Sequence, residues 1–187
     1  MLFTETKLKG AFIIESNIHQ DERGFFARSF DINEFEEKGL ISKFVQSSIS
    51  YNKTKGTVRG MHYQVKPFQE GKLVRCTRGS VFEVLLDIRP QSKTFLTWIS
   101  VELSANNYNM VYVPKGVILG FQTLEDNTEL IYQMTEYYTP EFQRGMKWND
   151  STFNIDWPLE MTVISKRDAS FSKFEYTTNK KDYFYLE

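Results

Sequence analysis

Hydrophobic and polar residues alternate along most of this chain, in short runs separated by turn residues. A period of two places successive side chains on opposite faces of a strand, so these runs predict β-strands. Ten strands are expected, over residues 11–16, 24–31, 43–50, 57–64, 72–79, 80–88, 94–103, 109–114, 118–124 and 129–138. Strands this short and this closely spaced predict an all-β sandwich or closed barrel, most simply a jelly roll.

One short helix is predicted among the strands, over residues 32–39, with Asp31 as its N-cap and Gly39 at its end. No linker, low-complexity run or internal repeat interrupts the 187 residues. Residues 1–187 are therefore expected to form a single domain with a sizeable core. The aromatic C-terminal tail, residues 171–187, is expected to pack on this domain or on a second subunit.

Composition and charge narrow the class of protein. The net charge of -1 gives no reason to expect binding to nucleic acid or to a membrane surface. No apolar run approaches the roughly 18 residues of a membrane span, and the first residues lack the order of a signal peptide. Cys76 is the single cysteine, so no disulfide framework is expected. These features predict a cytoplasmic protein.

A protein-held metal is not expected. Metal sites in small β-barrels usually need two or three imidazoles. This sequence has only His19 and His62, which lie 43 positions apart, and Cys76 has no second thiol. His62 therefore suits proton transfer better than metal binding, since the ordinary pKa of histidine lies near ~6.5.

In the segment "TVRGMHYQ", residues 57–64, the question is which face of the strand the side chains of Arg59 and His62 take. A lone histidine in an apolar strand is most often structural, and Arg59 lies three residues from His62, on the opposite face of a regular strand. Gly60 changes this expectation, because an interior glycine often marks a bulge that resets which face a side chain takes. With a bulge, Arg59 and His62 both point into one cavity.

Three cations near turns, Arg23, Arg59 and Lys72, form a possible anion site. Arginine binds phosphate oxygens in pairs, whereas lysine supplies a compact charge. Each of them alone is more often a solvated surface charge. Tyr132, in the alternating run "LIYQMTEYY", is either a core residue or a proton donor that reaches a cavity.

Several motifs in order give the chain a family resemblance. They are "DERGFFARSF" (21–30), "GTVRGMHYQ" (56–64), "GKLVRCTRGSVFEVLLDIR" (71–89), "VPKGVILGFQTL" (113–124), "YYTPEFQRGMKWND" (137–150) and "SKRD" (165–168). Over roughly residues 10 to 168 the chain resembles the dTDP-4-dehydrorhamnose 3,5-epimerases. The resemblance implies a cupin-type jelly roll with a few short helices, a homodimer without cofactor or metal, and a role in making surface polysaccharide sugars.

The resemblance also implies roles for individual residues. His62 matches the family's general base, and Asp168 matches the carboxylate that orients its ring. Tyr132 matches the acid that returns a proton from the opposite face, and Lys72 matches the cation beside the enolate oxygen. The expected substrate-binding residues are Arg23, Phe26, Arg28, Gln46, Arg59, Leu119, Tyr138, Gln143 and Arg167. Among these, Arg23 and Arg59 match diphosphate ligands, and Tyr138 matches a residue that stacks on the nucleobase.

Departures from the family pattern bear on the substrate. Leu119 stands where the family has a histidine, and Arg28 and Gln143 each stand where it has a glutamate. A carboxylate only accepts hydrogen bonds, whereas a guanidinium only donates them and an amide does both. The expected substrate is therefore a 4-keto hexose or heptose on a nucleoside diphosphate. The two substitutions predict a preference for a nucleotide other than dTDP, with GDP the first to test. Leu119 leaves open whether C3, C5 or both are inverted.

Two other functions remain open from the sequence. A ketoisomerase on the same fold would move the ketone by similar proton chemistry. A non-catalytic cupin that only binds sugar nucleotides is the alternative from a different class. The arrangement of "RGMHYQ" and Tyr132 favours an epimerase over a ketoisomerase, and the joint presence of His62, Lys72, Tyr132 and Asp168 favours an enzyme over a binding protein.

Overall fold

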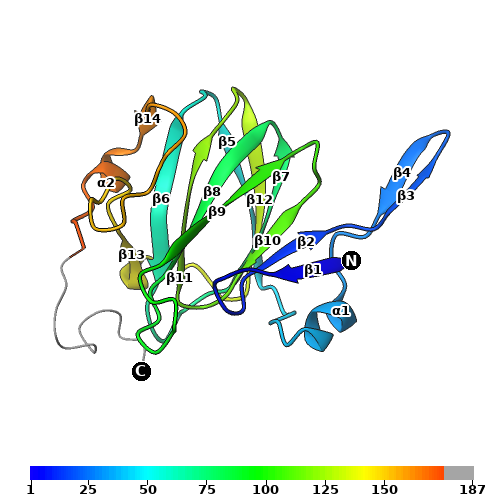
Figure 1. Cartoon of the computed structure of the whole chain (residues 1–187), viewed down its shortest axis with the longest axis horizontal. Helices are drawn as coiled ribbons and strands as arrows, with labels where there is room; N and C mark the ends of the chain where they lie inside the picture. The colour runs from blue at the N-terminus through cyan, green and yellow to red at the C-terminus, as the bar shows by residue number, and fades with distance from the viewer. Residues whose placement is uncertain (175–187) are drawn as a thin grey trace.

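The computed structural model of the protein describes residues 1–174 and consists mainly of two facing β-sheets (Figure 1). The first sheet has the order β1 (Leu2–Glu5), β2 (Phe12–Glu15), β10 (Met110–Val113), β7 (Lys72–Arg78), β12 (Thr128–Met134) and β5 (Gln46–Asn52). The second has the order β13 (Gln143–Gly145), β6 (Thr57–Gln64), β11 (Val117–Thr123), β8 (Ser80–Asp87) and β9 (Trp98–Ser104). A short strand, β14 (Val163–Ile164), adds to β6 in parallel.

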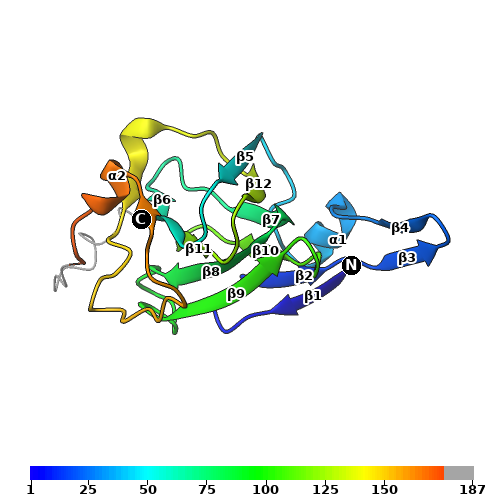
Figure 2. The ribbon, with the colours of Figure 1, turned by 90° about the horizontal axis from the view of Figure 1, so that it is seen from above.

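The main hydrophobic core fills the space between the two sheets. Inward-facing side chains of β7, β10 and β12 meet those of β8, β9 and β11, with Val74, Leu85, Val111 and Leu130 completely buried. A second cluster on the outer face of the second sheet lies under the segment that holds Met146, Phe153 and Trp157. The sheets are not joined into one cylinder, so the expected jelly roll takes the form of a sandwich (Figure 2).

All ten predicted strands are present, with ends shifted by a few residues. The predicted helix is confirmed as α1 (Ile32–Glu37), where the Asp31 side chain accepts hydrogen bonds from the backbone N–H groups of Asn33 and Glu34. The buried ring of Phe35 anchors this helix in a third hydrophobic cluster. None of the helices in residues 1–174 is long and apolar enough to cross a membrane.

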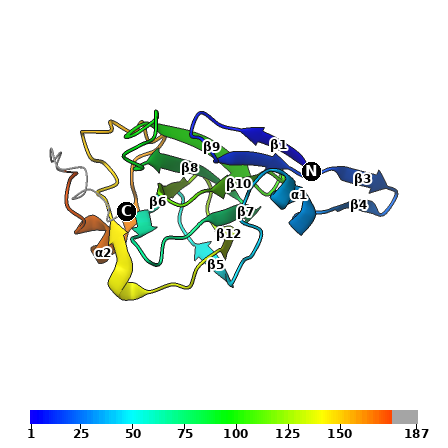
Figure 3. The ribbon, with the colours of Figure 1, turned by 90° about the horizontal axis from the view of Figure 1, so that it is seen from below.

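Two strands near the N-terminus were not predicted. β1 is a four-residue edge strand, and β3 (Ile18–Asp21) pairs with β4 (Gly24–Ala27) in a hairpin. All four β3 residues are exposed, so no buried stripe marks this strand in the sequence. The hairpin extends away from the sandwich, on the side opposite the short helix α2 (Lys166–Ala169) (Figures 1 and 3). Most of the predicted aromatic tail, from residue 175 on, lies outside the described residues.

β6 contains the irregularity that Gly60 predicted. Leu119 of β11 pairs with His62 and Phe121 pairs with Arg59, so β6 has one more residue than β11 between these pairs. This extra residue turns Arg59 and His62 to the same face. Gly60 has a φ of +112°, and a Cβ there would lie 2.6 Å from the Gly120 Cα and 2.9 Å from the Leu119 carbonyl oxygen. Only glycine suits both this conformation and this close approach of two backbones.

We therefore predict that Gly60→Ala destabilises the fold through both strain and crowding. The backbone conformation alone costs about 1–3 kcal/mol for a residue with a side chain. Gly39→Ala is the matched control, because Gly39 has a φ of +69° but no atom lies within 4 Å of the point that a Cβ there would occupy. Urea denaturation should give a clearly larger loss of unfolding free energy for Gly60→Ala. Equal losses would show that crowding against β11 contributes nothing.

Candidate active site

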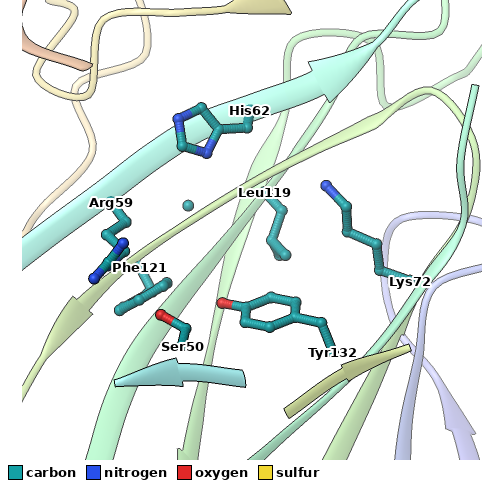
Figure 4. Close-up of a pocket in the computed structure, with 8 residues that line it drawn as sticks. Ser50, Arg59, His62, Lys72, Leu119, Phe121 and Tyr132 are labelled. Carbon is teal, nitrogen blue, oxygen red and sulfur yellow. The ribbon is translucent and has the colours of Figure 1, made fainter. Parts of the chain in front are cut away.

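A cavity of about 200 Å³ opens between the two sheets at the irregular part of β6. It is lined by Ser50, Arg59, His62, Lys72, Leu119, Gly120, Phe121 and Tyr132. Figure 4 shows His62 and Tyr132 on opposite sides of this cavity, while the Lys72 ammonium reaches in from a third side. The structure thus brings together three of the four predicted catalytic side chains, together with Arg59 and Leu119.

His62 is held by Asp168, the fourth predicted catalytic residue. The His62 Nε2 and the Asp168 Oδ1 are 2.9 Å apart, and the Gly60 N–H donates to the Asp168 Oδ2 at 3.0 Å. Burial acts to raise the pKa of Asp168, but the hydrogen bonds from His62 and Gly60 outweigh it and the pKa is lowered. Asp168 is therefore a carboxylate that orients the ring through Nε2 and leaves Nδ1 outside this contact.

The local sequence around α2 explains why the Asp168 side chain lies beside His62. Ser165 caps the N-terminus of α2, and its side chain accepts a hydrogen bond from the Asp168 N–H. The ring of Phe171, just after the helix, packs edge-on against the His62 ring, with centroids 5.7 Å apart. Gly145 leaves the space that Phe171 occupies, since a Cβ there would lie 2.1 Å from the phenyl ring.

Tyr132 approaches from the opposite sheet. It lies on β12, where alternation places its side chain on the same inner face as Leu130. Burial raises the pKa of Tyr132 well above its ordinary value, and Glu83 raises it further when its carboxyl group is ionised. The phenol is therefore protonated at neutral pH, as a proton donor must be.

Two cations border the cavity, and each is fixed by the chain around it. The Lys72 Nζ lies 2.9 Å from the Glu70 Oε1, and both side chains are largely buried. The Arg59 Nε donates to the Asn52 Oδ1 at 2.7 Å. Because these contacts hold the positive groups in place, a substrate oxyanion meets charges that need little reorganisation.

A second group of predicted residues lies beside α2. The Tyr138 hydroxyl donates to the Gln143 Oε1 at 2.7 Å, and Arg167 donates to the same oxygen. The Tyr138 backbone N–H donates to the Gln46 side chain at 2.6 Å. Arg167 also lines a cavity of about 380 Å³ between β6, β14 and α2, which shares Arg59 and His62 with the first cavity.

Gln46, Tyr138 and Gln143 line neither cavity, and neither do three further predicted residues, Arg23, Phe26 and Arg28. Arg23 is paired with Asp21 at the tip of the β3–β4 hairpin, and its side chain is 85% exposed. Phe26 is 72% exposed on β4. The Arg28 Nη1 lies 2.9 Å from the Asp31 Oδ2 near α1. All three lie at the end of the molecule away from α2 (Figure 1).

Sequence reasoning did not find every residue that positions the site. It missed Asn52 and Glu70, the partners of the two cations, and Ser50, which lines the cavity. Of these three residues, only Glu70 could have been found from the sequence, because a negative charge two residues before Lys72 suggests an ion pair. Within residues 1–174, no three His, Cys, Asp or Glu side chains come together in a way that could hold a metal ion.

Comparisons with known proteins agree with this geometry. The family model described as dTDP-4-dehydrorhamnose 3,5-epimerase matches residues 5–176. The Shigella flexneri protein of that name is 42% identical, over 91% of this chain and 94% of its own length.

Solved structures give the same result. The Bacillus anthracis dTDP-4-dehydrorhamnose 3,5-epimerase, with TDP and PPi bound, matches with a TM-score of 0.90 and 35% identity, over 92% of this chain and 99% of its own. The dTDP-6-deoxy-D-glucose-3,5-epimerase of Legionella pneumophila, in complex with dTDP-4-keto-L-rhamnose, matches with a TM-score of 0.86 and 39% identity, over 92% of each chain. These relatives are epimerases rather than ketoisomerases or binding proteins.

Proposed function

The chain belongs to the dTDP-4-dehydrorhamnose 3,5-epimerase family of isomerases, and from this membership we propose that it inverts C3 and C5 of a dTDP-linked 4-keto sugar. The observation that carries the proposal is the placement of His62 and Tyr132 on opposite sheets, across one small cavity, with Lys72 beside them. An inversion needs a base on one face of a carbon and an acid on the other, and this cavity offers both.

The chemistry follows from the ketone in the substrate. A 4-keto group acidifies the hydrogens on C3 and C5, because the electron pair left on carbon spreads onto the carbonyl oxygen. In the proposed mechanism His62 removes the proton, Lys72 stabilises the enolate oxygen, and Tyr132 returns a proton to the opposite face. The ketone is regenerated at the end, so the net reaction involves no change of oxidation state.

The proposed carrier is dTDP, since the relatives are named for dTDP sugars and two were solved with TDP or a dTDP sugar. The sequence-based preference for GDP depended on Arg28 and Gln143. In this structure Arg28 pairs with Asp31, and Gln143 accepts hydrogen bonds from Tyr138 and Arg167. These internal partners support the proposal of dTDP, because neither side chain needs a different base as its partner. The cytoplasmic location stays a prediction from the sequence.

We further propose a homodimer in which each β3–β4 hairpin completes the pocket of the partner subunit. The hairpin extends away from its own sandwich (Figure 1), and it holds the exposed side chains of Arg23 and Phe26. If these residues bind substrate, the pocket they serve is on another chain. The outer face of β5 and β12 supports the dimer as well, because Ile49 is 69% exposed there and lies opposite Ile131 in the register.

The assignment of base and acid is tested by two variants in deuterium oxide. His62→Asn should lower deuterium exchange into the substrate by ~10²–10⁴-fold, the usual contribution of a general base. Tyr132→Phe should reduce the net amount of epimer more than it reduces exchange, since Tyr132 acts after the proton has left. NMR reads exchange at each carbon, so exchange at one carbon only would limit the reaction to that centre. Near-normal exchange in His62→Asn would overturn the assignment.

Sharing of the hairpin is tested by mixing two inactive variants. His62→Asn lacks the base but has an intact hairpin, whereas Arg23→Ala combined with Phe26→Ala has the base but a deficient hairpin. Half of the dimers formed at random contain one subunit of each, and one of their two pockets is complete, so activity should recover to about a quarter of wild type. No recovery, with mixed dimers present, would show that each hairpin does not serve its partner.

The carrier is tested by calorimetric titration with dTDP, GDP, CDP and UDP. We expect dTDP to bind tightest, by about tenfold or more, because a mismatched base leaves a buried polar group unpaired at about 1–3 kcal/mol. Gln143→Glu serves as the comparison variant and should leave the order of the four nucleotides unchanged. Tighter binding of GDP than dTDP would restore the sequence-based expectation.

A further inference from the structure

Glu83 is a buried carboxyl that the mechanism above does not use. It lies on β8 with no exposed surface, and neither of its side-chain oxygens has a hydrogen-bond partner among the described residues. Its neighbours on the same face of the strand, Val81 and Leu85, belong to the core between the sheets. A carboxyl group without partners in an apolar layer is costly to ionise, and proteins rarely keep one without a function.

The position of Glu83 relates it to the cavity. It pairs in the β8–β11 register with Phe121, which lines the cavity, and directly paired residues share a face of the sheet. Glu83 itself is not in the cavity wall, so it lies behind the residues that a substrate would touch. A group in this position acts on the substrate through its neighbours.

Three titratable groups of the described residues face Glu83 from the opposite sheet. Lys72 and Cys76 lie on the inner face of β7, and Tyr132 lies on β12. The neighbours of Glu83 in its own sheet, Phe121 and Val101, carry no charge. Burial raises the pKa of the Cys76 thiol to about 11, so Cys76 is neutral near pH 7. The charge of Glu83 therefore acts on Lys72 and Tyr132.

Glu83 is uncharged at neutral pH. Burial raises its pKa to about 8, although the positive charge of Lys72 acts in the opposite direction. A negative charge on Glu83 raises the pKa of Tyr132 and attracts the Lys72 ammonium. Both effects oppose the reaction, since Tyr132 becomes a phenolate when its O–H bond breaks and the new C–H bond forms. Two negative charges close together in a medium of low dielectric repel strongly.

We propose that Glu83 is a positioning residue of the epimerisation. Its neutral carboxyl does not compete with the enolate for the Lys72 ammonium and lets Tyr132 release its proton, whereas its carboxylate opposes both. This inference rests on the proposed function, because it concerns the roles of Lys72 and Tyr132 in that reaction. If the inference holds, the charge state of Glu83 affects the rate of the second proton transfer, from Tyr132, more than the rate of the first one, to His62.

Glu83→Gln tests the kinetic part, since glutamine keeps the shape and cannot ionise. In wild type, the ratio of net epimer to deuterium exchange should fall as the pH rises above about 8. In Glu83→Gln the ratio should stay level over the same range, and exchange at neutral pH should stay close to wild type. A fall that persists in Glu83→Gln, or a folded but inactive Glu83→Gln, would overturn the inference.

The pH dependence of stability tests the protonation of Glu83 without any substrate, so this test does not depend on the proposed function. The folded state holds the Glu83 proton up to about pH 8, whereas the ordinary pKa of 4.5 applies after unfolding. The folded state therefore binds more protons between these values, and wild type loses stability as pH rises through this window. The melting temperature of Glu83→Gln, relative to wild type, should increase between about pH 5 and about pH 8.

Glu102→Gln, at an exposed position of the neighbouring strand β9, is the matched control and should show no such increase. If the relative melting temperature of Glu83→Gln does not change with pH, the inference is wrong whatever the activity. If it changes as expected but wild type shows no deuterium exchange, the proposed function fails and the inference fails with it.

Discussion

The carboxylate of Asp168 is the interaction on which the geometry of the pocket depends, because it holds two groups of β6 at once. One oxygen bonds to the His62 ring, and the other accepts the N–H of Gly60, at the point where β6 has its extra residue. The same carboxylate that orients the His62 ring therefore also stabilises the bulge that turns this ring inward. Leaving either group without its partner in this buried position would cost a full desolvation penalty.

The bulge in turn depends on two glycines. Gly60 and Gly120 face each other across β6 and β11, and their backbones approach more closely than any side chain would allow. A regular β6 would direct Arg59 and His62 to opposite faces, and the cavity would lose one of these two side chains. Backbone geometry, more than the identity of the side chains, thus decides that β6 supplies both Arg59 and His62 to the cavity.

Burial decides which ionisable groups at the pocket carry a charge. Lys72 and Arg59 have polar partners in Glu70 and Asn52, and of these two cations Lys72 is the one whose side chain is largely buried. Tyr132 and Glu83 have raised pKa values because burial disfavours their charged forms. Fixed positive charge at the cavity is therefore combined with a protonated Tyr132 in its wall and a protonated Glu83 behind it, an arrangement that can stabilise negative charge developing on a substrate.

The sequence by itself determined the elements whose signals are local. Alternation located ten strands, the Asp31 cap located α1, and Gly60 indicated the bulge. Linked motifs gave the family, which the comparisons confirmed. These features depend on neighbouring residues or on short patterns, so they can be read without knowing which strands pair.

Only the tertiary structure decided which distant residues meet. The contact of Asp168 with His62 spans 106 positions, and the placement of Glu83 behind Tyr132 depends on how two sheets face each other. The structure also separated Arg23 and Phe26 from the pocket that the motifs assigned to them. The physical reason is that sheet packing and strand order bring together residues remote in sequence, and no local pattern records the partners of a side chain.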